Sequence, residues 1–153
     1  SAGGAPDAET VLNLATYTIP ANTIKDGTVV RVKGHVLVSD GTSAATLTIR
    51  ARLGGVGGTL LVASSAVNVA TNDYGYFEIE LHGTAAPGGT VPVNAIAKVR
   101  DLAAAGADAF ISAYDATNAA TNGALDLVLT GQWNGGAADD DANLTLMSVS
   151  IEG

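Results

Sequence analysis

Glu78, Glu80 and His82 are the residues of this chain whose types and spacing come nearest to a catalytic set. Side chains two positions apart in an extended strand point to the same face, so all three would share one surface. Paired carboxylates on such a surface are typical of glycoside hydrolases. A sugar cleft also needs exposed aromatic rings, and aromatic residues make up only 5% of this sequence. We therefore interpret the three residues as part of a solvated outer face.

Three further patterns could bind an ion, and each has a simpler interpretation. The run from Asp139 to Asp141 could ligate Ca²⁺ but lacks the spaced ligands and distal glutamate of a calcium loop. A charged turn is favoured there, and cation binding stays open. His35 and His82 have no cysteine or second histidine at ligand spacing, which disfavours a zinc site or a catalytic triad. The "GGVGGT" of residues 54–59 lacks the lysine and helix of a phosphate-binding loop. We predict no catalytic residue, metal site or cofactor.

The elements that would position these residues are short segments in which apolar and polar residues alternate. They lie at 11–19, 28–38, 44–53, 58–63, 76–82, 91–101, 124–133 and 142–152. Turn residues separate them, for example Lys25, Asp26 and Gly27. About eight strands at this spacing predict an all-β, single-domain antiparallel β-sandwich or barrel. The alanine-rich residues 101–110 are interrupted by Gly106, so we expect at most one helical turn there and a loop over 102–123.

The alternation also assigns a face to each strand residue. Arg50 and Arg52 point outward, and the apolar residues between and beside them point inward. The same count predicts that the core contains Val30, Val32, Leu47, Ile49, Ala51, Leu53, Phe77, Ile79, Leu81, Leu125, Leu127, Leu129 and Trp133. In the last segment the apolar parity changes after Leu146, which predicts a β-bulge near that residue.

Composition and charge exclude several classes of protein. The 153 residues suit one domain, and the absence of cysteine excludes disulfides and cysteine nucleophiles. Fifteen acidic and seven basic residues give a net charge of −8, the wrong sign for binding nucleic acid. No run approaches the roughly 18 apolar residues of a membrane span. Residues 1–10 lack the pattern of a secretory signal, so we expect an unexported chain with a flexible arm at 1–10 and a folded domain at 11–153.

The segment "TIPANTIKDGTVVRV", followed by "LTIRARLGG", resembles a group of tailed-bacteriophage virion proteins with a jelly-roll fold. The later "FEIELHGTA" and the closing "NLTLMSVSIEG" are also similar to that group, and the resemblance covers most of residues 12–153. Members of the group serve as capsid decoration or cement proteins, head fibres or tail-fibre modules. The resemblance implies a jelly roll and a structural part, not a catalyst.

The leading expectation from this resemblance is a decoration protein on the outer surface of a phage head. It would be made in the host cytoplasm, and its partners would be the major capsid protein and further copies of itself, as a dimer or a trimer. The alternatives are a fibre module that contacts host glycans, a cellular carbohydrate-binding β-sandwich and, least favoured, an enzyme.

Two sets of residues are candidates for the contacts with these partners. The first is the arm, which we expect to order only on a neighbouring subunit and which includes Ser1, Ala2, Gly3, Gly4, Ala5 and Pro6. The second follows from the jelly roll, in which the third and sixth strands are neighbours. That order would place Arg50 and Arg52 beside Lys98 and Arg100 on an outer face. The patch would be neutralised by Glu152 or Asp101, or would meet carboxylates of a neighbouring subunit.

Overall fold

The structure is a computed structural model that describes residues 8–39, 46–64, 66–68, 73–83, 90–100, 110–120, 123–134 and 141–153. Over these residues the chain forms ten β-strands. They are β1 (Thr10–Ile19), β2 (Val29–Ser39), β3 (Thr46–Leu53), β4 (Thr59–Ala63), β5 (Val67–Asn68), β6 (Asp73–Gly83), β7 (Thr90–Arg100), β8 (Phe110–Ala120), β9 (Leu125–Asn134) and β10 (Asp141–Glu152). In this part of the chain, no helix has the length and apolar character needed to cross a membrane.

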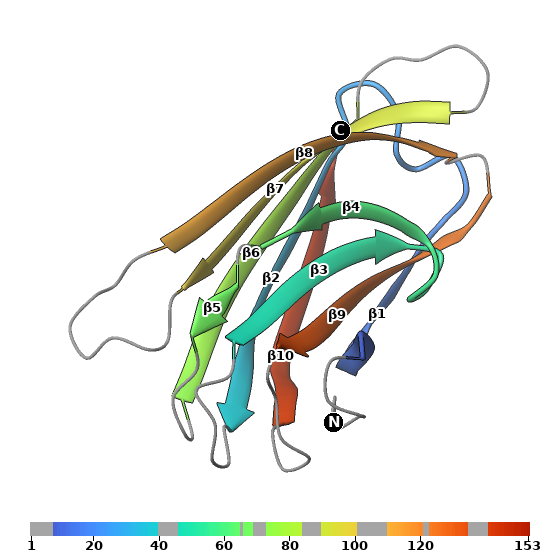
Figure 1. Ribbon diagram of the computed structural model, residues 1–153. Coiled ribbons are helices and arrows are strands. Elements are labelled where there is room, and N and C mark those ends of the chain that lie inside the picture. The colour runs from blue at the N-terminus through green and yellow to red at the C-terminus, as the bar shows by residue number, and fades with distance from the viewer. Residues whose placement is uncertain are drawn as a thin grey trace.

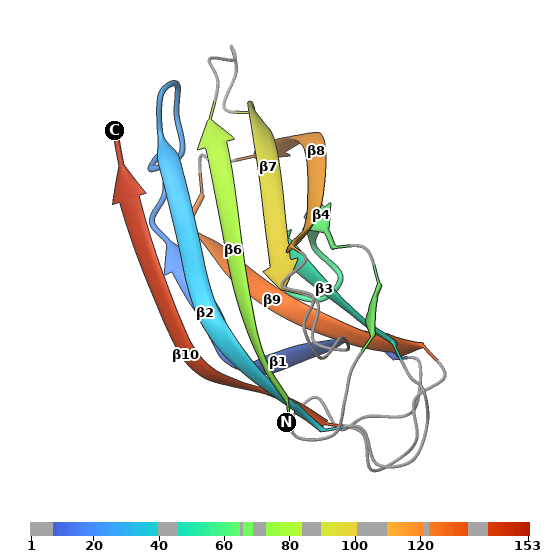
Figure 2. The ribbon, with the colours of Figure 1, turned by 90° about the vertical axis from the view of Figure 1, so that its left-hand side faces the viewer.

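The strands form two antiparallel sheets that pack as a β-sandwich (Figure 1). The first sheet has the order β1-β9-β3-β4, with β5 also paired to β3, and the second has the order β10-β2-β6-β7-β8. Figure 2 shows β10, β2, β6 and β7 side by side, with β9 of the first sheet crossing them obliquely. The predicted antiparallel β-sandwich and all eight predicted strands are confirmed. The jelly-roll topology stays a prediction.

Two strands were not predicted from the sequence. The short β5 pairs with the start of β3, and the long β8 pairs with β7 along its whole length. The prediction of a loop over 102–123 is therefore wrong for residues 110–120. Its sequence, "FISAYDATNAA", is rich in residues with low strand propensity. The segment forms a strand because it pairs with β7 along its whole length, and this pairing outweighs the low propensity. The predicted helical turn lies, except for Phe110, outside the described residues.

The core lies between the two sheets and consists of the residues that the alternation places inward. In β3, every second residue is buried from Leu47 to Leu53, and in β6 Phe77, Ile79 and Leu81 are at most 1% exposed. The predicted inward positions of β2 are buried as well, and so are Leu127, Leu129 and Trp133 of β9, whereas the side chain of Leu125 lies outside the described ones. Because one face of each strand is removed from water, a shift of one residue in register would expose the whole apolar set, so the register is strongly specified.

The predicted bulge in the last strand is confirmed, since the register between β10 and β2 shifts between Leu144 and Leu146. The backbone of β10 approaches β2 closely at this point. A Cβ atom on Gly34 would lie 2.5 Å from Cζ of Phe77 and closer still to the carbonyl oxygen of Leu146. Glycine is therefore required at position 34 by the space available.

The turn before β2 is also confirmed. The backbone N–H of Thr28 donates to the carbonyl oxygen of Lys25 over 3.0 Å, and Gly27 between them has a φ of 80°. The hydroxyl of Thr28 donates to the carbonyl oxygen of Thr23, which ties the turn to the preceding loop. This turn fixes where β2 starts and hence which of its residues face outward.

Candidate functional site

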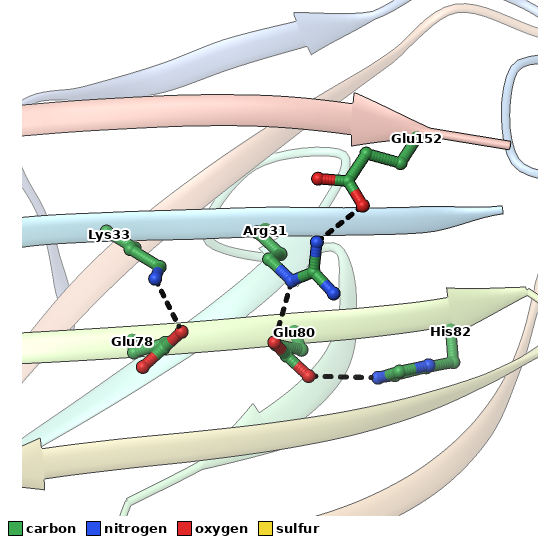
Figure 3. A network of polar contacts seen from close by, with 6 residues as sticks. All are labelled: Arg31, Lys33, Glu78, Glu80, His82 and Glu152. Atoms are coloured by element: carbon green, nitrogen blue, oxygen red, sulfur yellow. Dashed lines mark hydrogen bonds and ion pairs between the residues drawn. The ribbon is translucent and has the colours of Figure 1, made fainter.

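The outer face of the second sheet carries a network of ion pairs around Glu78 and Glu80 (Figure 3). Arg31 donates from Nε to Oε1 of Glu80 over 2.8 Å and from Nη1 to Oε2 of Glu152 over 2.6 Å. Lys33 Nζ lies 3.0 Å from Oε1 of Glu78. The pairs run directly across the ladder, because Arg31 is opposite Glu80 and Lys33 is opposite Glu78. Cross-strand pairs of opposite charge stabilise a sheet by a few tenths of a kcal/mol to about 1 kcal/mol each.

This network explains the spacing that resembled a catalytic pair. The guanidinium of Arg31 holds the pKa of Glu80 below its usual range, with a smaller contribution from His82, whose Nε2 lies 3.2 Å from Oε2. A carboxylate with a lowered pKa is a poor general acid near neutral pH. Glu78 is engaged by Lys33, and that contact raises the pKa of the lysine. The prediction of an outer face is confirmed, although its carboxylates are bound to cations.

The predicted patch of Arg50, Arg52, Lys98 and Arg100 is wrong. Its arginines on β3 belong to the first sheet, whereas its two cations on β7 belong to the second. The physical reason is that β9 takes the place beside β3, while β6 and β8 flank β7. In register, Lys98 is opposite Glu78 and Arg100 is opposite Phe110. Glu152 does not neutralise the arginines of β3, because it binds Arg31; Asp101 lies outside the described residues.

The partner of the two arginines on β3 is Glu9, which precedes β1. Arg52 donates from Nε and Nη2 to the two carboxylate oxygens of Glu9 over 2.6 and 2.8 Å, and from Nη1 to the carbonyl oxygen of Gly58. The hydroxyl of the buried Thr130 on β9 also donates to Glu9. The Glu9 side chain is only 16% exposed. Planar, two-point pairing of this kind is stronger than a single contact.

This contact corrects the boundary of the predicted arm. Glu9 is held against β3 and β9, and Thr10 already pairs with Gly131 in β9, so residues 9 and 10 belong to the folded domain. The six predicted arm residues from Ser1 to Pro6 lie outside the described residues. Sequence reasoning missed Glu9 because glycine and proline precede it. The one available signal was parity: Leu12 faces the core, so Glu9 has the parity of the outward face.

The Glu9 carboxylate should make the stability of the protein depend on pH. Hydrogen bonding to Arg52 is the main reason that its pKa is lowered, and this outweighs the opposing effect of burial. A carboxylate whose pKa is lower in the folded state stabilises the fold above its unfolded pKa, about 4.3 for glutamate. The stabilisation is lost as the pH falls through the lower folded pKa.

We expect Glu9→Gln to lower the free energy of unfolding by about 1–3 kcal/mol near neutral pH, because hydrogen bonds to charged groups contribute about that much. Urea unfolding at about pH 7 and about pH 3 measures the difference, which should shrink at the lower pH as the parent also loses this charge. Glu152→Gln is the control, since that side chain is 59% exposed and should change stability by less than about 1 kcal/mol. An equal deficit for Glu9→Gln at both pH values would contradict this role.

Arg50 is bound much less completely than Arg52. Its Nη1 lies 3.9 Å from Oε2 of Glu9, beyond hydrogen-bond distance, and is buried without any hydrogen-bond partner. Arg50 lines a hollow of about 260 Å³ on the outer face of the first sheet. The other lining residues are Thr48, Gln132, Trp133 and Asn134.

A second open feature lies where the two sheets meet, between β1 and β10. Thr16 and Tyr17 of β1 and Met147 and Val149 of β10 line a groove of about 290 Å³ there. Met147 and Val149 have the inward parity of β10, yet they are only partly buried. Tyr17, Leu146 and Ile151 are 36%, 57% and 36% exposed, so three of the four large apolar side chains that are exposed in the described part of the chain lie on these two strands.

The two features differ in what they can bind. The hollow at Arg50 offers a cation and polar groups, and the groove between β1 and β10 offers apolar surface.

Among the residues that the structure describes, no three histidine, aspartate or glutamate side chains gather as a metal site would require. Asp141, the described member of the aspartate run, starts β10 and accepts a hydrogen bond from Nδ2 of Asn143 over 2.6 Å.

The sequence matches no protein-family model and no curated protein.

Proposed function

We propose that this chain is a non-enzymatic structural protein of a bacteriophage virion, and that it serves as a decoration protein on the head. The observation that carries the proposal is the apolar surface along β1 and β10, where Tyr17, Leu146 and Ile151 are exposed. Leu146 is opposite His35 on the outer face of β10 and Ile151 is opposite Val30 on its inner face, so these residues border the edge of the sandwich from both faces. Exposed apolar residues that gather at one edge of a rigid sandwich are typical of an interface. The resemblance of residues 12–153 to phage virion proteins supplies the biological setting.

The partner at this surface is a second copy of the chain. β10 ends the second sheet (Figure 2), and no charged residue lies between Asp141 and Glu152 at its two ends. Natural edge strands usually carry lysine, proline or other charged residues that prevent pairing with another chain. The net charge of −8 makes two copies repel each other, and a strand without charges lets them approach with the least repulsion. The charge pattern therefore favours self-association through β1 and β10.

The alternative of a glycan-binding fibre module has less support. Sugar recognition commonly uses the exposed face of an aromatic ring, and Trp133 is 6% exposed and belongs to the core cluster. Tyr17 is exposed, but it lines a groove whose other large side chains are apolar. We therefore favour assembly over glycan binding.

The copy number of the protein in purified phage particles tests the proposed role. We expect quantitative mass spectrometry to give a number of copies comparable with that of the major capsid protein, because a decoration protein covers the head lattice. Purified protein added to undecorated heads should bind until these sites are filled. A handful of copies per particle would contradict the decoration role in favour of a fibre, and absence from the particles would contradict a virion role altogether.

A further inference from the structure

We propose that the hollow beside Arg50, on the outer face of the first sheet, is a binding site for a carboxylate group. The proposal rests on the geometry of this site and is independent of the decoration role. A buried guanidinium nitrogen without a hydrogen bond is uncommon, because a lost partner costs about 1–3 kcal/mol. Nη1 of Arg50 is such a nitrogen.

The two arginines of β3 differ in how completely their guanidinium groups are hydrogen-bonded. Both arginines leave β3 on the same face, two positions apart. All three nitrogens of the Arg52 guanidinium donate hydrogen bonds, two of them to Glu9. Both carboxylate oxygens of Glu9 thus accept hydrogen bonds from Arg52, and Oε2 of Glu9 lies 3.9 Å from Nη1 of Arg50.

The charges of this cluster favour a ligand with a single negative charge. Among the described residues of this cluster, Glu9 neutralises Arg52 and Arg50 carries the remaining positive charge. A carboxylate would cancel that charge. Because Nη1 is buried, the guanidinium must turn toward the hollow before it can donate two parallel hydrogen bonds to the carboxylate. A doubly charged phosphate would leave an excess negative charge close to Glu9, so the site should discriminate against it.

The neighbouring strands supply polar groups around the same point. Thr48 and Gln132 are directly opposite each other in the β3–β9 ladder, and Asn134 is opposite Thr46. Their side chains line the hollow with Arg50. Its volume of about 260 Å³ is several times the roughly 30 Å³ that one water molecule occupies, so a carboxylate and part of the group that carries it can enter.

Two sources could provide this carboxylate, an acidic side chain of a protein or the acid group of a uronic acid. The experiment uses the full chain labelled with ¹⁵N and follows the side-chain amide signals of Gln132 and Asn134 by NMR. The probes are N-acetylglutamate amide and glucuronate, with sodium phosphate and sodium chloride at equal ionic strength as comparison anions. We expect at least one carboxylate to shift both amide signals in a saturable way. A preference for one probe identifies the source.

Variants then assign the binding to the guanidinium. Arg50→Gln should weaken carboxylate binding at least tenfold, and Arg50→Lys should weaken it less, because it keeps the charge but loses the planar pair of donors. Lys33→Gln removes one positive charge from the other sheet and should leave binding unchanged, which controls for the net charge. Thermal unfolding of each variant checks that it is folded.

Three results would overturn the proposal. The first is that neither carboxylate shifts the amide signals of the folded parent. The second is that phosphate or chloride shifts them as strongly as the carboxylates do. The third is that Arg50→Gln binds as tightly as Lys33→Gln.

Discussion

Replacing Gly34 with alanine should lower the free energy of unfolding by about 3 kcal/mol, at the upper end of the usual cost of overpacking a core. The added Cβ would lie 2.5 Å from Cζ of Phe77, which is completely buried, and would also meet the carbonyl oxygen of Leu146. That oxygen belongs to the backbone at the bulge of β10, so it cannot turn aside as a flexible side chain could. Urea denaturation measures the loss.

Gly57→Ala is the matched control for this prediction. A Cβ on Gly57 would have no atom within 4 Å, and the same substitution there should change stability by a few tenths of a kcal/mol. A double-mutant cycle with Phe77→Leu, which shortens the side chain that the new methyl meets, should show that the two substitutions are coupled by about 0.5 kcal/mol or more. A cost for Gly34→Ala no larger than that for Gly57→Ala would show that β2 and β10 can separate there without penalty.

Introducing lysine at both Leu146 and Ile151 should weaken self-association about tenfold to a hundredfold. Fully burying an exposed large aliphatic side chain contributes about 1.5–3 kcal/mol. Leu146 and Ile151 are 57% and 36% exposed, which together amounts to about one such side chain, so losing both contacts costs about 1.5–3 kcal/mol, and every 1.4 kcal/mol is a factor of ten. The substitutions also reduce the net charge from −8 towards zero, which would by itself favour association. A loss of association would therefore report the loss of apolar contact. Sedimentation velocity over a range of protein concentrations measures it.

The control for this experiment is Val56→Lys, compared with the single substitution Ile151→Lys. Val56 and Ile151 are 38% and 36% exposed, and each substitution adds one positive charge, but Val56 lies between β3 and β4, away from the proposed interface. We expect Val56→Lys to associate like the parent. A parent protein that stays monomeric at all concentrations would contradict self-association through β1 and β10, and so would equal effects of the two single substitutions.

The sandwich could be predicted because the strands of the core alternate strictly. In β3, and in β6 from Phe77 to His82, each apolar residue faces the core and each polar residue faces outward, so the sequence pattern reports burial directly. The bulge at Leu146 was visible for the same reason, since a change of parity needs an extra residue. β8 has no such pattern: its small and polar residues form a strand because β7 offers a ladder, and that is a tertiary effect.

The candidate sites were harder to predict because alternation gives the face of a residue and not its neighbours. The outward direction of Arg50 and Arg52 is correct, but their proposed neighbours on β7 came from an assumed strand order. β9 lies beside β3 instead, and β9 in turn brings β1 and Glu9 to the arginines. Glu9 and Arg52 are 43 residues apart, and no local rule connects them. The pairing of the Glu78 and Glu80 carboxylates with Lys33 and Arg31 likewise depends on the register of β2 against β6.

The place of β9 in the first sheet also determines when the chain can fold during its synthesis on the ribosome. β9 lies between β1 and β3, so Ile19 must wait for Leu125 and Leu53 must wait for Leu127. The second sheet can start earlier, since β6, β7 and β8 are consecutive along both the chain and the sheet and β2 precedes them, and only its edge strand β10 arrives late. Pairings between residues so far apart in sequence make folding slow, typically milliseconds to seconds for all-β domains. The edges of β1 and β3 that pair with β9 therefore remain unpaired on the nascent chain until residues 125–134 emerge, which is the stage of synthesis at which this protein is most exposed to aggregation.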